Sequence, residues 1–158
     1  MRIKGITDED FLNYKVPSMY ICSSTCDFKC DKESGMACCQ NSALANQPSI
    51  DLDDDYIILR YLSNKITKAI VIAGLEPFDQ AEEVIELIAS LRGDFGCNDD
   101  VVIYTGYNPG EVKEIVEQLS CFGNVIVKFG RFIPGSNRKY DSVLGVWLAS
   151  PNQFGKKL

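Results

Sequence analysis

Residues 68–74 read Lys-Ala-Ile-Val-Ile-Ala-Gly, and this run decides the fold class. Five apolar residues follow one another without a polar residue between them, a pattern typical of a strand that is buried on both faces. Such strands occur in parallel sheets, because the helices that connect parallel strands cover both faces of the sheet. The run therefore predicts a central strand of an α/β sheet.

Other segments repeat this pattern. Val101-Val-Ile-Tyr-Thr-Gly106 and Asn124-Val-Ile-Val-Lys-Phe-Gly-Arg-Phe132 are each predicted to form a buried strand. Ser18–Ile21 is a shorter apolar segment with the same prediction. Val143–Ala149 is a further strand candidate, and it follows a loop centred on residues 134–137. The chain therefore offers a series of strands for one sheet.

Helices are predicted between these strands. Asp79-Gln-Ala-Glu82 has the spacing of a capping box with Asp79 as the cap, and Asn108-Pro-Gly-Glu111 has proline at the favoured first helical position. An earlier helix is predicted to begin in Asp51–Asp55 and to end near Asn64, with acidic residues at the positive end of its dipole. An apolar stripe follows each of the caps at Asp79 and Asn108. The first stripe is Val84, Ile85, Ile88 and Leu91, and the second is Val112, Ile115, Val116 and Leu119.

Alternating strands and helices in 158 residues indicate one α/β domain over residues 1–158. Between Thr25 and Pro48 the sequence shows no periodicity, and this segment is predicted to be a long ordered loop. Four of the seven cysteines fall in it: Cys26, Cys30, Cys38 and Cys39. The thiols indicate that the loop is functional.

The composition excludes several classes of function. The chain has no histidine, which excludes Ser-His and Cys-His catalytic pairs and histidine-ligated zinc hydrolases. A net charge of −6 disfavours a nucleic-acid backbone as partner. No apolar run has the length of a membrane span, and the charged N-terminus is unlike a signal peptide. We therefore expect the cysteines in the reducing cytoplasm, where metal binding or redox chemistry is favoured over disulfides.

The close spacing of the cysteines predicts a metal centre. Three residues separate Cys26 from Cys30, and Cys38 and Cys39 follow eight and nine positions later. Four thiolates from these residues would satisfy a structural zinc ion. Three thiolates would instead hold an iron–sulfur cluster and leave one iron open for chemistry. The residues alone leave both metals open.

Three further segments follow the carboxyl ends of predicted strands. They are Gly74-Leu-Glu-Pro77, Tyr104-Thr-Gly-Tyr107 and Lys128–Arg131. Because the carboxyl ends of parallel strands meet at one edge of a sheet, these segments and the cysteine loop are expected to form one composite site. Gly74 would let a ligand approach the backbone closely.

These motifs, in this order, resemble those of radical S-adenosylmethionine (SAM) enzymes, and most of all the activating proteins of anaerobic (class III) ribonucleotide reductase. Cys26-x3-Cys30 resembles the first two cluster cysteines of that family, and Cys39-Gln-Asn41 resembles its third, which a Tyr-Asn commonly follows. Gly74–Pro77 resembles a Gly-Gly-Glu/Asp-Pro motif, and Tyr104–Tyr107 a Thr-Gly-Tyr strand end.

The resemblance continues to the end of the chain. Gly130-Arg-Phe132 resembles a Gly-Lys-Phe, and Ser150-Pro-Asn-Gln153 resembles a Ser-Ser-Asn-Gln, so that the similarity extends from about Ser18 to Gln153. It implies a compact, partial (βα) barrel-like parallel sheet of the radical SAM type, with a long cluster-binding loop at about residues 22–48. Leu75 stands where the family has the second glycine of its Gly-Gly pair, which would reshape the SAM pocket.

The resemblance implies two cofactors, a 4Fe-4S cluster and SAM. The cluster ligands would be Cys26, Cys30 and Cys39, although the spacing here is C-x3-C-x8-C and that of the family is C-x3-C-x2-C. Two alternatives remain open for the third ligand. In one, the register is Cys22, Cys26 and Cys30; in the other, Cys38 replaces its neighbour Cys39.

For SAM, the resemblance implies binding across the strand ends. Glu76, expected at a strand tip rather than in the core, would accept a hydrogen bond from the amino group. Arg131 would pair with the carboxylate through both arms of its guanidinium. The other expected SAM-binding residues are Gly74, Pro77, Thr105 and Asn152.

The implied activity is reductive cleavage of SAM and generation of a glycyl radical on an anaerobic ribonucleotide reductase. The implied partners are that glycyl-radical subunit and a flavodoxin- or ferredoxin-type electron donor, with no nucleic acid and no membrane. From the net negative charge, a docking face rich in Lys and Arg is expected on the partner. Two alternatives stay open: a small-molecule radical SAM enzyme similar to 7-carboxy-7-deazaguanine synthase, and a non-catalytic iron–sulfur or zinc-binding module.

Overall fold

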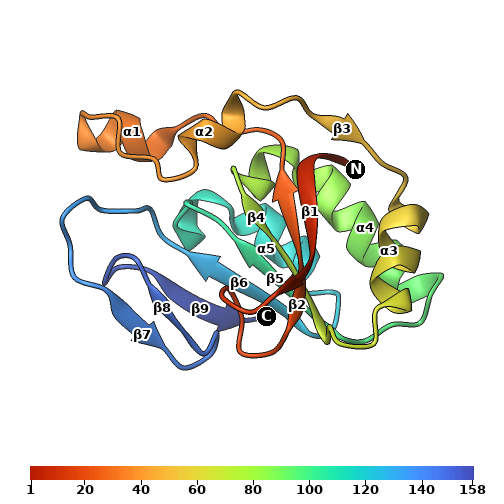
Figure 1. The fold of residues 1–158 in the computed structure, drawn as a ribbon. Helices are drawn as coiled ribbons and strands as arrows, with labels where there is room; N and C mark the ends of the chain where they lie inside the picture. Colours follow the sequence, from red (N-terminus) through yellow and green to blue (C-terminus); the bar gives the residue numbers. More distant parts are fainter.

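The computed structural model describes residues 1–158, with a mixed sheet of seven strands at its centre (Figure 1). The strand order is β3-β1-β2-β4-β5-β6-β9. These strands are β1 (Arg2–Asp10), β2 (Ser18–Ser23), β3 (Ile50–Asp51), β4 (Ala69–Gly74), β5 (Asp100–Tyr104), β6 (Val125–Phe129) and β9 (Phe154–Lys157). A separate antiparallel hairpin joins β7 (Lys139–Asp141) to β8 (Val146–Leu148).

The four central strands are those that the apolar runs predict. β2, β4, β5 and β6 pair in parallel, which confirms the predicted strands at the centre of the sheet. The expectation of a parallel sheet is wrong at both edges, because β1 and β3 on one side and β9 on the other are antiparallel. β9 lies at one edge, and β3 pairs with β1 only at Arg2 and Ile3. Both β1 and β9 carry charged residues and no continuous apolar run, since each leaves part of its surface in water.

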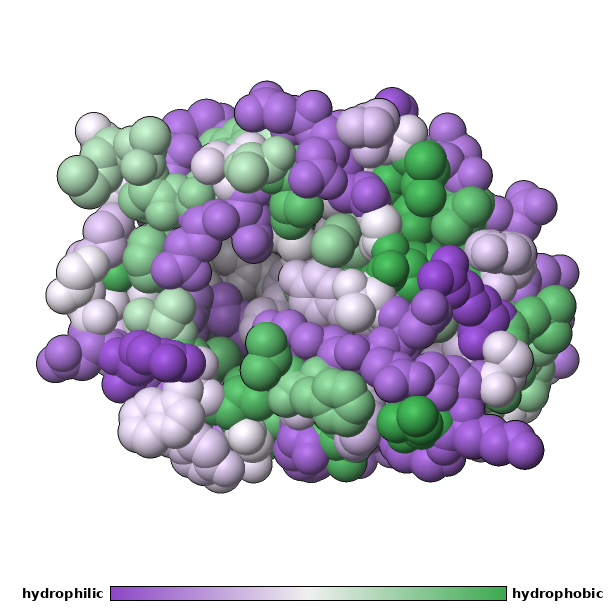
Figure 2. Space-filling model, in the orientation of Figure 1, coloured by the Kyte–Doolittle hydropathy of each residue, from purple (hydrophilic) through white to green (hydrophobic).

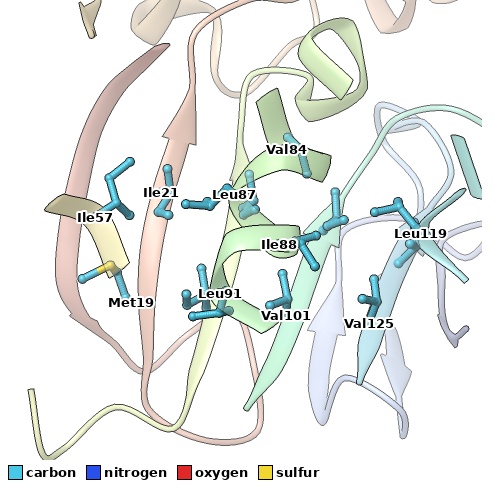
Figure 3. Packing of buried hydrophobic residues seen from close by; sticks show 14 of the residues in the cluster. Met19, Ile21, Ile57, Val84, Leu87, Ile88, Leu91, Val101, Leu119 and Val125 are labelled. Carbon is cyan, nitrogen blue, oxygen red and sulfur yellow. The ribbon is translucent and has the colours of Figure 1, made fainter. Parts of the chain in front are cut away.

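Three helices cover one face of the sheet. They are α3 (Asp54–Ser63), α4 (Ala81–Gly93) and α5 (Lys113–Leu119). Figure 3 shows Val84, Leu87, Ile88 and Leu91 of α4 lying against strand residues such as Ile21 and Val101. This layer forms the larger hydrophobic core. None of the helices combines the length and the apolar character that crossing a membrane requires.

Two helix starts differ in how well the sequence predicts them. The predicted helix start at Asn108–Glu111 is confirmed: Asn108 and Glu111 form a capping box around a 3-10 turn, η2 (Pro109–Glu111), ahead of α5. The cap assigned to Asp79 is wrong: Asp79 lies inside a 3-10 turn, η1 (Pro77–Gln80), and the side chain of Glu76 caps that turn by accepting the amide of Phe78. Pro77 fixes the first position of η1, so the chain turns before α4 begins.

The segment predicted to be a loop contains two short helices, α1 (Lys29–Ser34) and α2 (Ser42–Ala45). Neither buries a side chain completely, which explains why no apolar periodicity marks them. Val143–Ala149 is likewise only partly a strand, since β8 covers its second half and pairs with β7 outside the main sheet.

The second face of the sheet is not covered by α3, α4 or α5. Its lower half is covered by the β1–β2 turn (residues 11–17) and by the β7–β8 hairpin, through Tyr14, Leu144 and Leu148. These side chains pack on Ala69, Val71, Ala73, Val102 and Ile126. The carboxyl ends of β4, β5 and β6 on this face remain free for a ligand.

Candidate metal centre

A cavity of about 700 Å³ opens at these free strand ends. Figure 2 shows a hollow on this face of the molecule, between the cluster loop and the β7–β8 hairpin of Figure 1. The expected convergence of the cysteine loop with three strand ends therefore exists in the structure. The lining includes Cys26, Cys30 and Cys39 together with Gly74, Glu76, Thr105, Lys128 and Gly130.

The turn between the first two cysteines holds an unusual backbone conformation. Phe28 has φ 55°, in the left-handed region that non-glycine residues seldom occupy. In this conformation its amide donates to the Sγ of Cys26 over 3.3 Å. An amide aimed at sulfur stabilises the thiolate and is one means of tuning a metal centre. The left-handed conformation of Phe28 thus accompanies a hydrogen bond from its amide to the sulfur of Cys26.

Asp31 builds the turn that carries the adjacent cysteines. Its Oδ1 accepts the amides of Cys38 and Cys39, at 2.9 and 2.8 Å. Cys39 then lines the cavity. Cys38 does not, because its Sγ lies 3.5 Å from the carbonyl oxygen of Cys30 and accepts from Ser34 Oγ at 3.3 Å. Of the two neighbours, only Cys39 shares a space with Cys26 and Cys30.

Cys22 lies apart from this group, on β2. It is half-buried and packs against Gly74, where an added Cβ would lie 3.1 Å from the Cα of Cys22. Gly74 has φ +88°, so both this close approach and the backbone conformation require glycine. Cys22 does not belong to the cavity lining. Gly74 therefore packs tightly against Cys22 at the end of β4, and Cys22 stays outside the cavity.

The thiols of the cavity fit a cluster held by three thiolates. Burial raises the pKa of Cys26 to about 12 and also raises the pKa values of Cys30 and Cys39, so that without metal all three are protonated. Lys128 and Arg131 counteract this effect at Cys30, because their positive charges favour its thiolate. Gly106 borders Cys30, since a Cβ there would lie 3.7 Å from the cysteine Sγ, an ordinary van der Waals contact.

Polar contacts tie the cluster loop to the strand ends. Asn41 Nδ2 donates to the carbonyl of Gly74 at 2.6 Å. The carboxylate of Asp79 accepts from the Asp27 amide at 2.9 Å and from the Tyr107 hydroxyl at 2.7 Å. Sequence reasoning assigned Asp79 to a helix cap and so missed this role. The only signal for it is the position of Asp79 just after a strand end.

Glu76 follows the end of β4, as expected, but it is buried, so the expectation that it lies outside the protein interior is wrong. Its side chain accepts hydrogen bonds from Thr105 Oγ1 at 2.7 Å and from the amides of Phe78 and Gly106 at 3.0 and 2.8 Å. Burial raises its pKa to about 7 in spite of these bonds. Oε2 accepts only the Gly106 bond, so it keeps acceptor capacity toward the cavity. Glu76 therefore joins the ends of β4 and β5.

Lys128 is a buried cation inside the cavity lining. Its Nζ donates to the carbonyl of Gly130 at 2.8 Å, and no carboxylate forms a salt bridge with it. Burial lowers its pKa to about 8. Sequence reasoning identified the segment Lys128–Arg131 but gave Lys128 itself no role. Its signal was a single lysine in an otherwise apolar strand.

Replacing Lys128 with methionine is expected to change how stability depends on pH. Because the folded pKa of Lys128 lies below the unfolded value, wild-type stability should fall as pH falls from about 10 through 8. Between high pH, where Lys128 is neutral, and pH values below 8, the free energy of unfolding should fall by about 3 kcal/mol. Urea unfolding of the metal-free chain at several pH values measures it, with Lys156→Met as the exposed control. Parallel pH profiles for wild type and Lys128→Met would contradict the assignment.

Arg131 lies beside the cavity and already has a partner. Its Nη1 and Nη2 contact both carboxylate oxygens of Glu111, at 2.7 and 2.5 Å, and Glu33 lies 3.1 Å from its Nε. The two arms expected to bind a SAM carboxylate are thus engaged within the chain. With Asn152, which donates to the Arg131 carbonyl at 3.0 Å, it lines a smaller cavity of about 260 Å³ that also contacts Cys30.

Of the remaining expected residues, Thr105 lines the large cavity and Pro77 does not. The Thr105 hydroxyl donates to Glu76 and accepts the amide of Tyr107 at 3.0 Å. Pro77 is buried at the start of η1, so its role is to shape the turn that presents Glu76. Leu75 is 8% exposed and also lines the cavity, where the resemblance expects glycine.

Comparison with known proteins supports a 4Fe-4S cluster in this chain. Residues 18–153 match the family described as a 4Fe-4S single cluster domain, and this range contains every cysteine and strand end of the cavity. No curated protein and no solved structure matches the chain. Since the family match covers most of the 158 residues, this iron–sulfur protein belongs to the family of 4Fe-4S single cluster domains.

Proposed function

We propose that the chain is a radical SAM activase that generates a glycyl radical on an anaerobic ribonucleotide reductase. One observation carries the proposal: Cys26, Cys30 and Cys39 line the same cavity as the carboxyl ends of three parallel strands. Three thiolates leave one iron of a 4Fe-4S cluster free for a ligand. The family membership supports the cluster, and the motif resemblance supports SAM as its ligand.

The arrangement of layers supports the proposed partial barrel. All three long helices lie on one face of the sheet, and the cavity lies on the other. A (βα) barrel places its helices outside and its ligands at the carboxyl ends of its strands. The antiparallel strands β1 and β9 end the parallel region, so such a barrel would be open on both sides.

In the proposed reaction, the bound cluster supplies one electron for the reductive cleavage of SAM. The chain would hold the cluster through Cys26, Cys30 and Cys39, which come from the loop beside the strand ends. Glu76 Oε2 offers an acceptor to the SAM amino group. Lys128 is the better candidate for the SAM carboxylate, since its Nζ is free of carboxylates and Arg131 is engaged by Glu111. Both side chains end in the cavity lining.

The open cavity supports a macromolecular substrate. A radical intermediate must be shielded from water and from other hydrogen donors. Strand ends form the base of the cavity, and the cluster loop and the β7–β8 hairpin border its opening. A polypeptide from the partner would complete the enclosure, which suits hydrogen abstraction from a backbone glycine. A flavodoxin- or ferredoxin-type protein is the proposed electron donor.

The test of this function uses the reconstituted, reduced chain with SAM and the co-encoded glycyl-radical reductase. We expect 5′-deoxyadenosine and methionine as products and a glycyl doublet in the electron paramagnetic resonance spectrum of the reductase. Cys26→Ala is the control and should give neither. SAM cleavage without a protein radical would overturn the activase and favour the small-molecule enzyme. No SAM cleavage, with a loaded cluster, would favour the non-catalytic module.

A further inference from the structure

A second surface borders the cavity, and neither the cysteines nor the proposed SAM site uses it. We call it the hairpin shelf and define it by six side chains of the β7–β8 hairpin and the β1–β2 turn. Its position is the lower edge of the hollow in Figure 2, where pale and green side chains gather. The six residues are Leu12, Lys15, Arg138, Lys139, Tyr140 and Trp147.

An aromatic pair forms the centre of the shelf. Tyr140 and Trp147 are directly opposite on β7 and β8, with ring centroids 5.7 Å apart in an edge-to-face arrangement. They are nevertheless 52% and 59% exposed. Leu12, 81% exposed, joins Trp147 in the lining of the large cavity. The apolar part of the shelf is thus continuous with the cavity.

Two contacts join the parts of the shelf. Arg138 Nη2 donates to the carbonyl of Trp147 at 3.1 Å, across the hairpin. At the other end of β8, Gly145 has φ +73°, and a Cβ there would lie 2.5 Å from the Cβ of Lys15. The β1–β2 turn therefore packs closely against the hairpin that carries the aromatic pair.

The charge of the shelf is opposite to that of the chain. Residues 128–158 contain six Lys and Arg residues and one Asp, although the whole chain has a net charge of −6. Lys139 adjoins Tyr140 in β7, Arg138 donates to the Trp147 carbonyl, and Lys15 contacts the hairpin at Gly145; all three are exposed. The net charge thus misleads about this surface, and a partner that carries Lys and Arg would be repelled from it.

We propose that the hairpin shelf docks an acidic polypeptide segment of a partner protein, with Trp147 as the anchor. Exposed Trp, Tyr and Arg side chains are the residues that dominate binding energy at protein interfaces. A segment lying over Tyr140 and Trp147 would continue directly into the cavity, because Arg138 and Trp147 line both. The identity of the partner rests on the proposed function, in which this segment would bring the target glycine.

The chain offers a direct probe for this proposal, because Trp147 is its single tryptophan. Biosynthetic 5-fluorotryptophan gives one ¹⁹F resonance, which reports on the shelf without any need for catalysis. The loaded protein is titrated with the co-encoded reductase. It is titrated separately with a synthetic peptide of Glu, Gly and Leu, and with a counterpart that has Lys in place of Glu. We expect the reductase and the acidic peptide to shift the resonance, and the basic peptide to leave it unchanged.

Charge reversal tests the location. Arg138→Glu/Lys139→Glu is expected to weaken both interactions roughly tenfold or more, and rising salt should weaken them in the wild type. The matched control is Lys65→Glu/Lys68→Glu, which changes net charge equally in the connection before β4, and it should change affinity by less than about twofold.

The outcomes separate this proposal from the proposed function. If neither the reductase nor the acidic peptide moves the resonance, or if the basic peptide moves it more, the docking proposal is overturned, whatever the glycyl-radical assay gives. If the acidic peptide binds at the shelf and the reductase neither binds nor acquires a radical, the shelf is supported and the activase is not. Equal weakening by the two charge-reversal pairs would also overturn the proposal.

Discussion

Alanine at position 26, 30 or 39 is expected to abolish the broad visible absorbance of the anaerobically reconstituted protein. Each of these cysteines lines the large cavity, and the chain offers no histidine as a replacement ligand. Losing one of three thiolates leaves an iron without its protein ligand, so the cluster should be lost rather than weakened. Iron and sulfide analysis and Mössbauer spectra measure the loss and distinguish iron from zinc.

Cys22→Ala and Cys38→Ala are the matched controls, and both should keep the cluster. Cys22 packs behind Gly74, and the Sγ of Cys38 contacts the Cys30 carbonyl and the Ser34 hydroxyl rather than the cavity. If Cys22→Ala or Cys38→Ala empties the site and Cys39→Ala does not, the ligand set proposed here is wrong. Cys121→Ala, at an exposed position after α5, controls for general effects of thiol removal.

Glu76→Ala is expected to have the second largest effect, on SAM binding and on stability together. The loss of a hydrogen bond to a charged group weakens binding by about 10- to 150-fold. In addition, the variant leaves the Phe78 and Gly106 amides and the Thr105 hydroxyl without their acceptor. Unpaired groups of this kind cost on the order of 2–4 kcal/mol in the free energy of unfolding. Equilibrium dialysis of SAM and urea unfolding measure the two effects.

Asp141→Ala separates these two effects. Asp141 is also a buried carboxylate that accepts three backbone amides, those of Val143, Leu144 and Gly155, but it does not line the cavity. It should destabilise the chain to a similar extent and leave SAM affinity within about twofold at a temperature where both variants are folded. Equal SAM affinity of Glu76→Ala and wild type would remove Glu76 from the site.

The ionisation of Glu76 predicts a pH dependence with a definite sign. Its folded pKa is raised to about 7 by burial, above that of the unfolded chain. The stabilisation is therefore complete below about pH 4 and is lost as pH rises through 7, since the folded chain holds the proton more tightly. In Glu76→Ala this part of the pH profile should be flat, which the same unfolding measurements would reveal.

The centre of the sheet could be predicted because the burial of a strand restricts which residues it can contain. A strand covered on both faces is apolar almost throughout. The apolar runs in 68–74, 101–106 and the start of 124–132 therefore predict β4, β5 and β6. The antiparallel strands β1 and β9 are partly exposed and carry charges, and the short helices α1 and α2 bury no side chain completely. Neither type leaves an apolar pattern.

The position of the candidate site was predictable because it follows from the sheet topology. Parallel strands bring their carboxyl ends to one edge, which is why the cysteine loop, Gly74–Pro77, Tyr104–Tyr107 and Lys128 meet at one cavity. What each side chain does there was not predictable. Arg131 pairs with Glu111, twenty positions earlier, and Glu76 is enclosed by Thr105 and Gly106 from the next strand.

The sequence by itself determined the cysteine-rich loop, the absence of histidine and the buried strands. It also determined that the carboxyl ends of these parallel strands meet at one edge of the sheet. These are properties of composition and of local periodicity, and they need no partner residue. Only the tertiary structure decided that Cys39 rather than Cys38 faces the cavity, that Lys128 is its unpaired cation, and that Trp147 stands in a basic surface on an acidic chain. Each of these depends on contacts between residues distant in the sequence, where charge and burial are set by neighbours that no local pattern records.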